Sequence, residues 1–189
     1  NHDLRAGKYG EELWQSHFGP SWYSFDVGNV HYVVTPMLGG DHAPSYRRSD
    51  IIRWLKNDLA QTDKGKRIVL FNHDLWFWGD DLLFKDKNGE QIDFADYNLD
   101  AMIYGHWHNH YYKQLKSGLH TYCSSTPDKG GIDHGTSCFR IYNADTKGKL
   151  SSATRYTYID AILTSAYPAE GETVSVPDGK MTVRINAYR

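Results

Sequence analysis

Apolar residues occur along the chain in short runs that are separated by turns rich in glycine and proline. In residues 8–18 and 49–60 the apolar positions recur at helical spacing, so both segments are predicted to be helices, with Ser49 as the N-cap of the second. Residues 68–71 and 99–104 are uninterrupted apolar runs, which are typical of strands buried on both faces. Histidine follows closely after each of these two predicted strands.

Three hairpins are predicted where β-forming segments flank short turns: residues 22–26 with 30–35, 111–115 with 119–124, and 135–143 with 149–158. Residues 75–97 are predicted to be a long excursion with at most short helical pieces. Residues 165–171 are typical of a linker and precede two short strand-like pieces. The pattern therefore predicts an α/β (α+β) domain whose second half is mostly antiparallel sheet.

Composition narrows the function classes. The 189 residues suffice for one domain with a proper core. The formal net charge is -2 and no basic run occurs, so no nucleic-acid-binding surface is evident. No apolar stretch approaches the roughly 20 residues that span a bilayer, so no membrane segment is predicted. Cys123 and Cys138 lie in predicted strands and are expected to be buried thiols rather than a disulfide framework.

A histidine-rich stretch after the second apolar run is the first candidate for chemistry. In extended backbone, residues two apart point to the same side, so His106 and His108 are expected to present two imidazoles to one or two metal ions. Gly105 supplies the turn at the end of the strand. His110 continues the alternation. A lone His-x-His is about equally typical of a solvated loop, so the metal interpretation depends on the rest of the chain.

Two other sites add to this interpretation. Asn1, His2 and Asp3 open the chain, and His73 follows the first apolar run. Because the ends of neighbouring strands converge at one edge of a sheet, these separated groups are expected to meet in one crevice.

In this combination the chain resembles the calcineurin-like metallophosphoesterases, the superfamily that contains purple acid phosphatases and many bacterial phosphohydrolases. That family has Gly-Asn-His-Asp/Glu, a strand ending in His, and Gly-His-x-His in this order, and the chain supplies Asn1-His2-Asp3, His73 and Gly105-His106-Trp107-His108. The resemblance covers residues 1–160. It implies a four-layer α-β-β-α sandwich missing its first strands, followed in residues 161–189 by a linker and the start of a β-rich segment.

The resemblance also implies a role for each residue. Asn1, His73 and His106 would be ligands of one divalent ion and His108 a ligand of a second, the ions being zinc, iron or manganese. A hydroxide bridging the two ions would attack a phosphate monoester or diester. His2 would stabilise the phosphoryl group or protonate the leaving oxygen, and Asp3 would orient His2, although a frayed chain end is the alternative for His2. The position of His110 is not a ligand in the family motif.

Departures from the family pattern set further expectations. The upstream Asp-x-His and Gly-Asp-x-x-Asp motifs are absent from the 189 residues, so the site is expected to be incomplete, to hold at most one ion well and to show little or no activity alone. The missing first strands would leave a sheet edge exposed, which favours a homo-oligomer.

Substrate contacts and the competing function class stay open at this stage. Trp76 and Trp78 follow His73 and could form an apolar wall for the alcohol part of a phosphoester, or could pack in the core. His134 lies in a loop that could reach a phosphate or could be a mere turn. The competing class is a non-catalytic β-rich module that binds a carbohydrate or protein partner and retains residual metal-binding histidines. The compartment is open, an extracytoplasmic bacterial location being one option.

Overall fold

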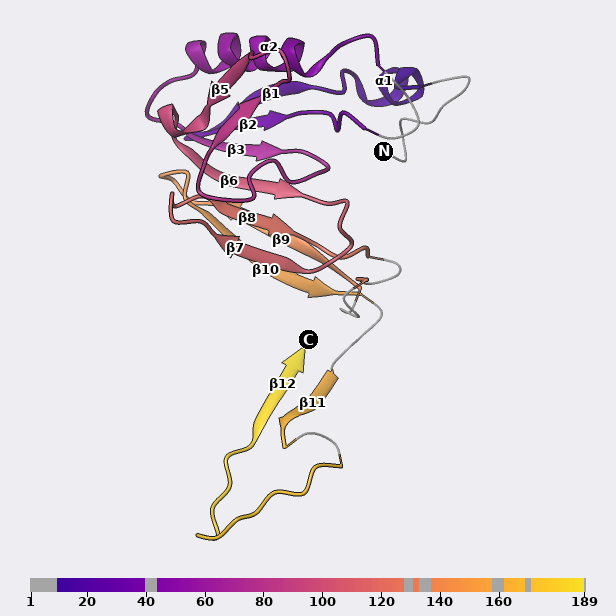
Figure 1. Ribbon diagram of the computed structural model, residues 1–189, viewed down its shortest axis with the longest axis vertical. Helices are drawn as coiled ribbons and strands as arrows, with labels where there is room; N and C mark the ends of the chain where they lie inside the picture. The colour runs from indigo at the N-terminus through magenta and orange to yellow at the C-terminus, as the bar shows by residue number, and fades with distance from the viewer. Residues whose placement is uncertain are drawn as a thin grey trace.

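The structure is a computed structural model that describes residues 10–39, 44–127, 131–132, 137–157, 162–168 and 171–188. Over these residues it is a mixed α+β protein with two α-helices, α1 (Glu12–Phe18) and α2 (Arg48–Gln61), and a six-stranded sheet (Figure 1). This confirms the predicted α/β class.

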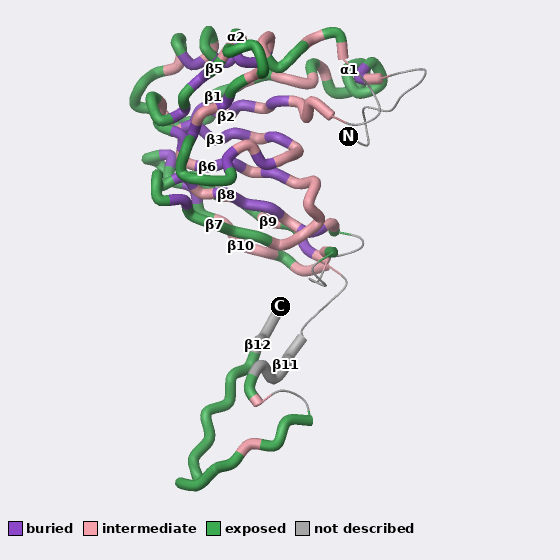
Figure 2. Tube along the Cα trace, in the orientation of Figure 1, coloured by how far each residue is buried: buried purple, intermediate pink, exposed green. Residues whose placement is uncertain are grey.

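The six strands lie in the order β1-β2-β3-β6-β8-β7. Their bounds are β1 (Tyr23–Val27), β2 (Val30–Val34), β3 (Arg67–Phe71), β6 (Leu99–Tyr104), β7 (Tyr111–Gln114) and β8 (His120–Cys123). The central pairs β2–β3, β3–β6 and β6–β8 are parallel, and the outer pairs β1–β2 and β7–β8 are antiparallel hairpins. The two apolar runs are therefore central parallel strands, which explains their lack of alternation. Buried positions run along these strands in Figure 2.

Helix α2 covers one face of the sheet. Its buried residues, Ile51, Ile52, Leu55 and Leu59, recur at helical spacing and join the cluster that contains Leu70 and Met102 of the sheet. Burying each such side chain stabilises the fold by roughly 1.5–3 kcal/mol. The predicted cap Ser49 is wrong, because the helix already begins at Arg48 with Arg47 at the N-cap position. The Asp50 carboxylate accepts the Arg47 backbone N–H at 2.7 Å.

The opposite face is covered by a hairpin of β9 (Cys138–Ala144) and β10 (Leu150–Tyr156), which pair antiparallel as predicted. Sequence neighbours along the sheet belong to different apolar clusters: Leu70 packs with the α2 cluster, whereas Val69 packs in a second cluster with Leu150 of β10. Because successive side chains of a strand point to opposite faces, the two clusters are two layers of core on either side of the sheet.

The excursion after β3 contains more structure than expected. β4 (Leu83–Lys85) and β5 (Gln91–Asp93) form a small antiparallel hairpin, followed by a 3-10 turn η1 (Phe94–Asp96). The side chains of Phe77, Phe84 and Phe94 join the α2 cluster, so apolar burial holds the excursion against the domain.

At the end of the chain, β11 (Ile162–Tyr167) pairs antiparallel with β12 (Arg184–Tyr188) as a separate two-stranded sheet. Residues 165–167 therefore belong to a strand, and the prediction that 165–171 form a linker is wrong for them. The two cysteines are buried and unbridged, as expected. Among the described residues, neither helix has the length and apolar character needed to cross a membrane.

Candidate metal centre

The candidate centre lies where β3 and β6 end side by side. Phe71 of β3 is opposite Ile103 of β6, and the Gly105 N–H donates to the His73 carbonyl oxygen at 3.1 Å. His73 and His106, each just past the end of its strand, consequently face each other with ring centroids 5.2 Å apart and planes at 67°. The parallel pairing of the two strands is what brings together two histidines from distant parts of the sequence.

Gly105 allows this close approach. A Cβ built at Gly105 would lie 3.3 Å from Nδ1 of the His73 ring. A side chain at this position would therefore press on the imidazole, and the absence of one lets the backbone pass directly beneath His73.

The backbone of the histidine loop differs from the prediction. His106 and His108 have φ angles of 64° and 48°, which is left-handed and not extended. The expectation that an extended backbone aligns them is wrong, because the chain reverses sharply after the strand, with the Trp107 N–H donating to the Gly105 carbonyl at 2.7 Å. Histidine tolerates this conformation better than β-branched residues. Both histidines nevertheless line one cavity of about 480 Å³, together with Trp78, Trp107, Asn109 and Ile132.

Trp107 fixes the loop through one hydrogen bond and one ring contact. Its Nε1–H donates to Oδ1 of Asp74 at 3.0 Å, and its ring lies edge-on to Tyr104 at 5.4 Å. Burial raises the pKa of Tyr104, and its hydroxyl finds no hydrogen-bond partner among the described residues. The hydrogen bond to Asp74 ties the histidine loop to the residue next to His73.

Asn72 anchors the other side of His73. Its side-chain amide is buried and donates to the backbone and hydroxyl of Thr35 and to the Pro36 carbonyl, while its Oδ1 accepts the Asp74 N–H at 2.8 Å. Sequence reasoning missed the positioning roles of Asn72 and Asp74. The signal was present, since Asn-His-Asp directly follows a buried strand.

The two tryptophans proposed as a substrate wall lie in different environments. Trp76 stacks on Phe84 with centroids 3.7 Å apart and planes at 6°, and it packs against the α2 cluster. Trp78 is 69% exposed and contacts Trp107 at 4.6 Å, beside the cavity of His106 and His108. Of the pair, Trp78 borders the histidine cavity.

His110 contacts residues of the β9–β10 hairpin. Its Nε2 lies 3.0 Å from Nη2 of Arg140 and 3.2 Å from the Thr154 hydroxyl, and its Nδ1 lies 3.3 Å from Sγ of Cys138. These contacts tie His110 to β9 and β10.

The structure thus brings His73 and His106 together and places His108 on the same cavity as His106. Within the described ranges, no group of three or more His, Cys, Asp or Glu side chains is arranged to hold a metal. Asn1, His2, Asp3 and His134 lie outside the described residues. The described donors are imidazoles, which suit zinc, iron or manganese and form part of a ligand set.

No protein-family model and no curated protein matches the chain.

Proposed function

We propose that the chain is part of a calcineurin-like metallophosphoesterase and contributes metal ligands for the hydrolysis of a phosphate monoester or diester. The observation that carries this proposal is the facing pair of His73 and His106 at the ends of two adjacent parallel strands. Crevices at the carboxyl ends of parallel strands are where α/β proteins bind ligands. Helix α2 packs on one face of the sheet and the β9–β10 hairpin packs on the other, and this layering supports the finer proposal of a four-layer sandwich.

In this proposal His73 and His106 hold one ion together with Asn1, and His108 holds the other. Bound divalent ions would supply a nucleophilic hydroxide at neutral pH and offset charge on the phosphoryl oxygens. The hydrogen bond from Trp107 to Asp74 keeps the loop of His106 in register with His73. His2, oriented by Asp3, would protonate the leaving oxygen.

The exposed side chain of Trp78 is the first proposed substrate contact. Trp78 offers an accessible ring beside the histidine cavity for the alcohol part of the substrate, and His134 is retained as a second contact. Trp76, which stacks on Phe84 and lines a cavity together with Trp78, would support this wall.

A non-catalytic binding module is the second candidate, and one observation favours it. Tyr23, Phe25 and Tyr32 form a row of stacked rings on the β1 edge of the sheet, with successive centroids 6.1 Å and 5.1 Å apart. Tyr23 and Phe25 are 39% and 45% exposed. Exposed aromatic rows of this kind suit a carbohydrate or a protein partner.

Metal analysis tests the proposed ligand set without depending on turnover. The chain would be loaded with zinc, iron or manganese, desalted and analysed for bound metal, with His73→Ala and His106→Ala alongside. We expect both variants to lose affinity by about 100-fold or more, since outer-shell substitutions alone cost roughly 10- to 100-fold.

His17→Ala is the matched control, because His17 lies on the exposed helix α1. This variant should bind metal like the unaltered chain. Equal metal content in all four proteins would remove His73 and His106 from the ligand set and favour the binding module. Circular dichroism would verify that each variant is folded.

A further inference from the structure

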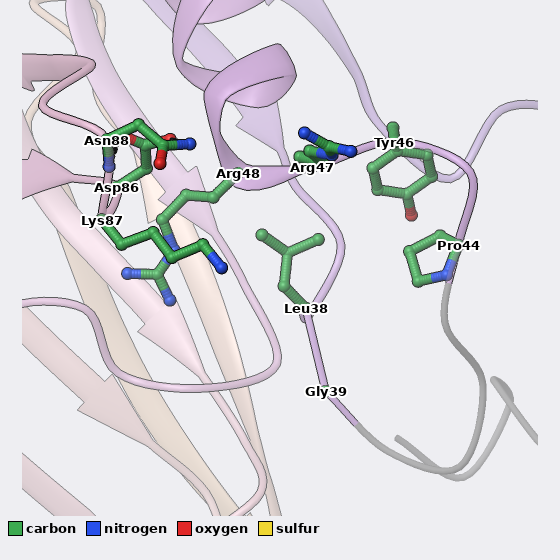
Figure 3. Close-up of a pocket in the computed structure, with 9 residues that line it drawn as sticks. All are labelled: Leu38, Gly39, Pro44, Tyr46, Arg47, Arg48, Asp86, Lys87 and Asn88. Atoms are coloured by element: carbon green, nitrogen blue, oxygen red, sulfur yellow. Dashed lines mark hydrogen bonds between the residues drawn. The ribbon is translucent and has the colours of Figure 1, made fainter.

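Another cavity, of about 780 Å³, lies beside the start of α2 (Figure 3). Three segments form its walls: the stretch after β2, the stretch leading into α2, and the turn between β4 and β5. Its lining comprises Leu38, Gly39, Pro44, Tyr46, Arg47, Arg48, Asp86, Lys87 and Asn88. The walls thus combine apolar side chains with several charges.

Three of the described lining residues, Arg47, Arg48 and Lys87, are cations. Within the part of the chain that the structure describes, Arg47, Arg48 and Lys87 form no ion pair. Other cations near α2 do pair, as Lys56 does with Glu90 at 2.9 Å. Acids on this surface therefore pair with cations outside the cavity, whereas the cations of the described lining form no such pair.

Asp86, the one acid among the described lining residues, is engaged in its own turn. Its Oδ1 accepts the backbone N–H groups of Asn88 and Glu90, both at 2.9 Å, and its Oδ2 accepts the Asn88 amide at 3.4 Å. These hydrogen bonds hold the β4–β5 turn that presents Lys87. The carboxylate therefore shapes the turn, and among the described lining residues three cations stand against this one acid.

Arg48 is held in place before any ligand arrives. Its guanidinium carbon lies 5.1 Å from the centroid of Phe84, and its Nη1 donates to the Lys85 carbonyl at 3.3 Å. Phe84 is itself 5% exposed and stacked on Trp76. A guanidinium has five N–H donors, so most of them stay free for a ligand while the stacking limits the entropy lost on binding.

The charge pattern matches a phosphate group better than a carboxylate. In Figure 3, Arg48 descends from the start of α2 and Lys87 extends across from the turn, while Leu38, Pro44 and Tyr46 form the facing wall. A planar guanidinium fork with an added ammonium supplies two positive charges and several donors. A phosphate monoester carries about -1.5 to -2 at neutral pH, whereas a carboxylate carries one negative charge.

A third cavity shares lining residues with this cavity and with the cavity of His106 and His108. It has a volume of about 340 Å³, shares Leu38 and Arg48 with the cavity beside α2, and is also lined by Asn72 and Asp74, the two neighbours of His73. This intermediate cavity also shares Trp78 with the cavity of His106 and His108, so neighbouring cavities lie between Arg48 and the histidines.

We propose that Arg48 and Lys87 form a phosphate-binding subsite that receives a second phosphate group on the alcohol part of the substrate. The subsite stands on its own contacts, whereas its use by a substrate rests on the proposed function. The ligand class is consequently a phosphoester that carries two phosphate groups.

The subsite is tested on the full chain freed of metal by chelation and dialysis. Pyrophosphate would be titrated at physiological ionic strength and followed by calorimetry. We expect Arg48→Gln and Lys87→Gln each to weaken binding about tenfold, because each removes a charge-assisted hydrogen bond. Arg53→Gln, on the same helix but paired with Asp50, should bind like the unaltered chain. Malonate should bind at least tenfold more weakly than pyrophosphate.

His106→Ala separates this inference from the proposed function, since it should leave pyrophosphate binding unchanged. Unaltered affinity in both subsite variants, an equal loss in Arg53→Gln, or malonate binding as tightly as pyrophosphate would overturn the subsite. Lys87 is exposed on a turn, so a folding defect cannot explain its variant. With metal bound, a series of alkane bisphosphates should bind more tightly than the matching monophosphates, and Arg48→Gln should abolish that difference. If bisphosphates and monophosphates bind equally tightly while the pyrophosphate results on the metal-free chain are as expected, the phosphate-binding subsite is supported and its use by a substrate is contradicted.

Discussion

At the scale of single residues, the contact between Gly105 and His73 decides how the two imidazoles are presented. The glycine backbone passes beneath the His73 ring, where an added Cβ would be 3.3 Å from Nδ1. The same ring also contacts His106, at 5.2 Å between centroids. An added methyl group can be accommodated only if the His73 ring shifts by a few tenths of an ångström.

Gly105→Ala should therefore lower the free energy of unfolding by about 1–2 kcal/mol, the usual cost of overpacking, and should weaken metal binding. Urea denaturation and metal analysis measure the two effects. Gly79→Ala is the control, since a Cβ there meets no atom within 4 Å and should change stability by less than about 0.5 kcal/mol. Equal effects of the two substitutions would argue against the contact.

The sequence was sufficient to single out His73, Gly105 and His106, because their order after two apolar runs is a local pattern. It was not sufficient to predict the left-handed backbone of His106, which depends on the reversal stabilised by Trp107. The hydrogen bond from Trp107 to Asp74 was also out of reach, since it joins residues that only strand pairing brings together.

At the scale of elements, the turn of the β9–β10 hairpin is bound directly to the turn of the β1–β2 hairpin. Gly148 has φ 76°, and a Cβ there would lie 2.7 Å from the Asn29 carbonyl oxygen. The same carbonyl accepts the Arg67 N–H at 2.9 Å, and the Asn29 side chain donates to the Thr146 carbonyl at 2.5 Å. One turn therefore links the covering hairpin to the start of β3.

Gly148→Ala should destabilise the fold by about 2–4 kcal/mol, the sum of left-handed strain and a backbone clash. Gly118→Ala isolates the strain, because Gly118 has φ 95° and open space around its Cβ position. It should cost only about 1–2 kcal/mol in the same urea denaturation experiment. A smaller effect at Gly148 than at Gly118 would mean that the two turns are not in contact.

Elements set by local periodicity were predicted well, namely the buried strands, the three hairpins and both helices. The predicted N-cap of α2 was wrong, because the side chain that accepts a backbone N–H at the start of the helix belongs to Asp50 and not to Ser49. Hydrophobic periodicity does not distinguish between such adjacent polar residues. The β4–β5 hairpin was missed because its strands are three residues each and depend on burial of Phe84 against the domain.

At the scale of the whole molecule, several tyrosines are buried on both sides of the sheet. Burial raises the pKa values of Tyr104, Tyr122 and Tyr142, since ionised phenolates would lose hydration there. The folded-state pKa of each tyrosine lies above its unfolded value of about 10. The contribution of these tyrosines to the free energy of unfolding is therefore fully present below pH 10 and declines as the pH rises further.

The sequence could not predict which elements cover which face of the sheet, because the alternation of side chains along a strand does not say which hairpin packs on which side.

Unfolding free energies measured from pH 8 to pH 11 should therefore be flat at first and fall above about pH 10. Each affected tyrosine would contribute up to about 1.4 kcal/mol per pH unit to the decline. Tyr104→Phe should reduce this slope. At pH 8 it should stabilise the protein by about 1 kcal/mol, because it removes a buried hydroxyl that has no partner among the described residues. The exposed Tyr23→Phe serves as the control, and an identical slope in both variants would contradict the assignment.

The parallel pairing of β3 with β6 also fixes an order of assembly. Between the two strands the chain must first close a long loop that contains β4, β5 and η1, and such non-local closure is slow compared with the formation of hairpins. A cation that needs both His73 and His106 has no binding site until this closure is complete. A metal bound by this pair would therefore stabilise a domain that has already folded. In a zinc finger, by contrast, metal binding drives the folding of the domain.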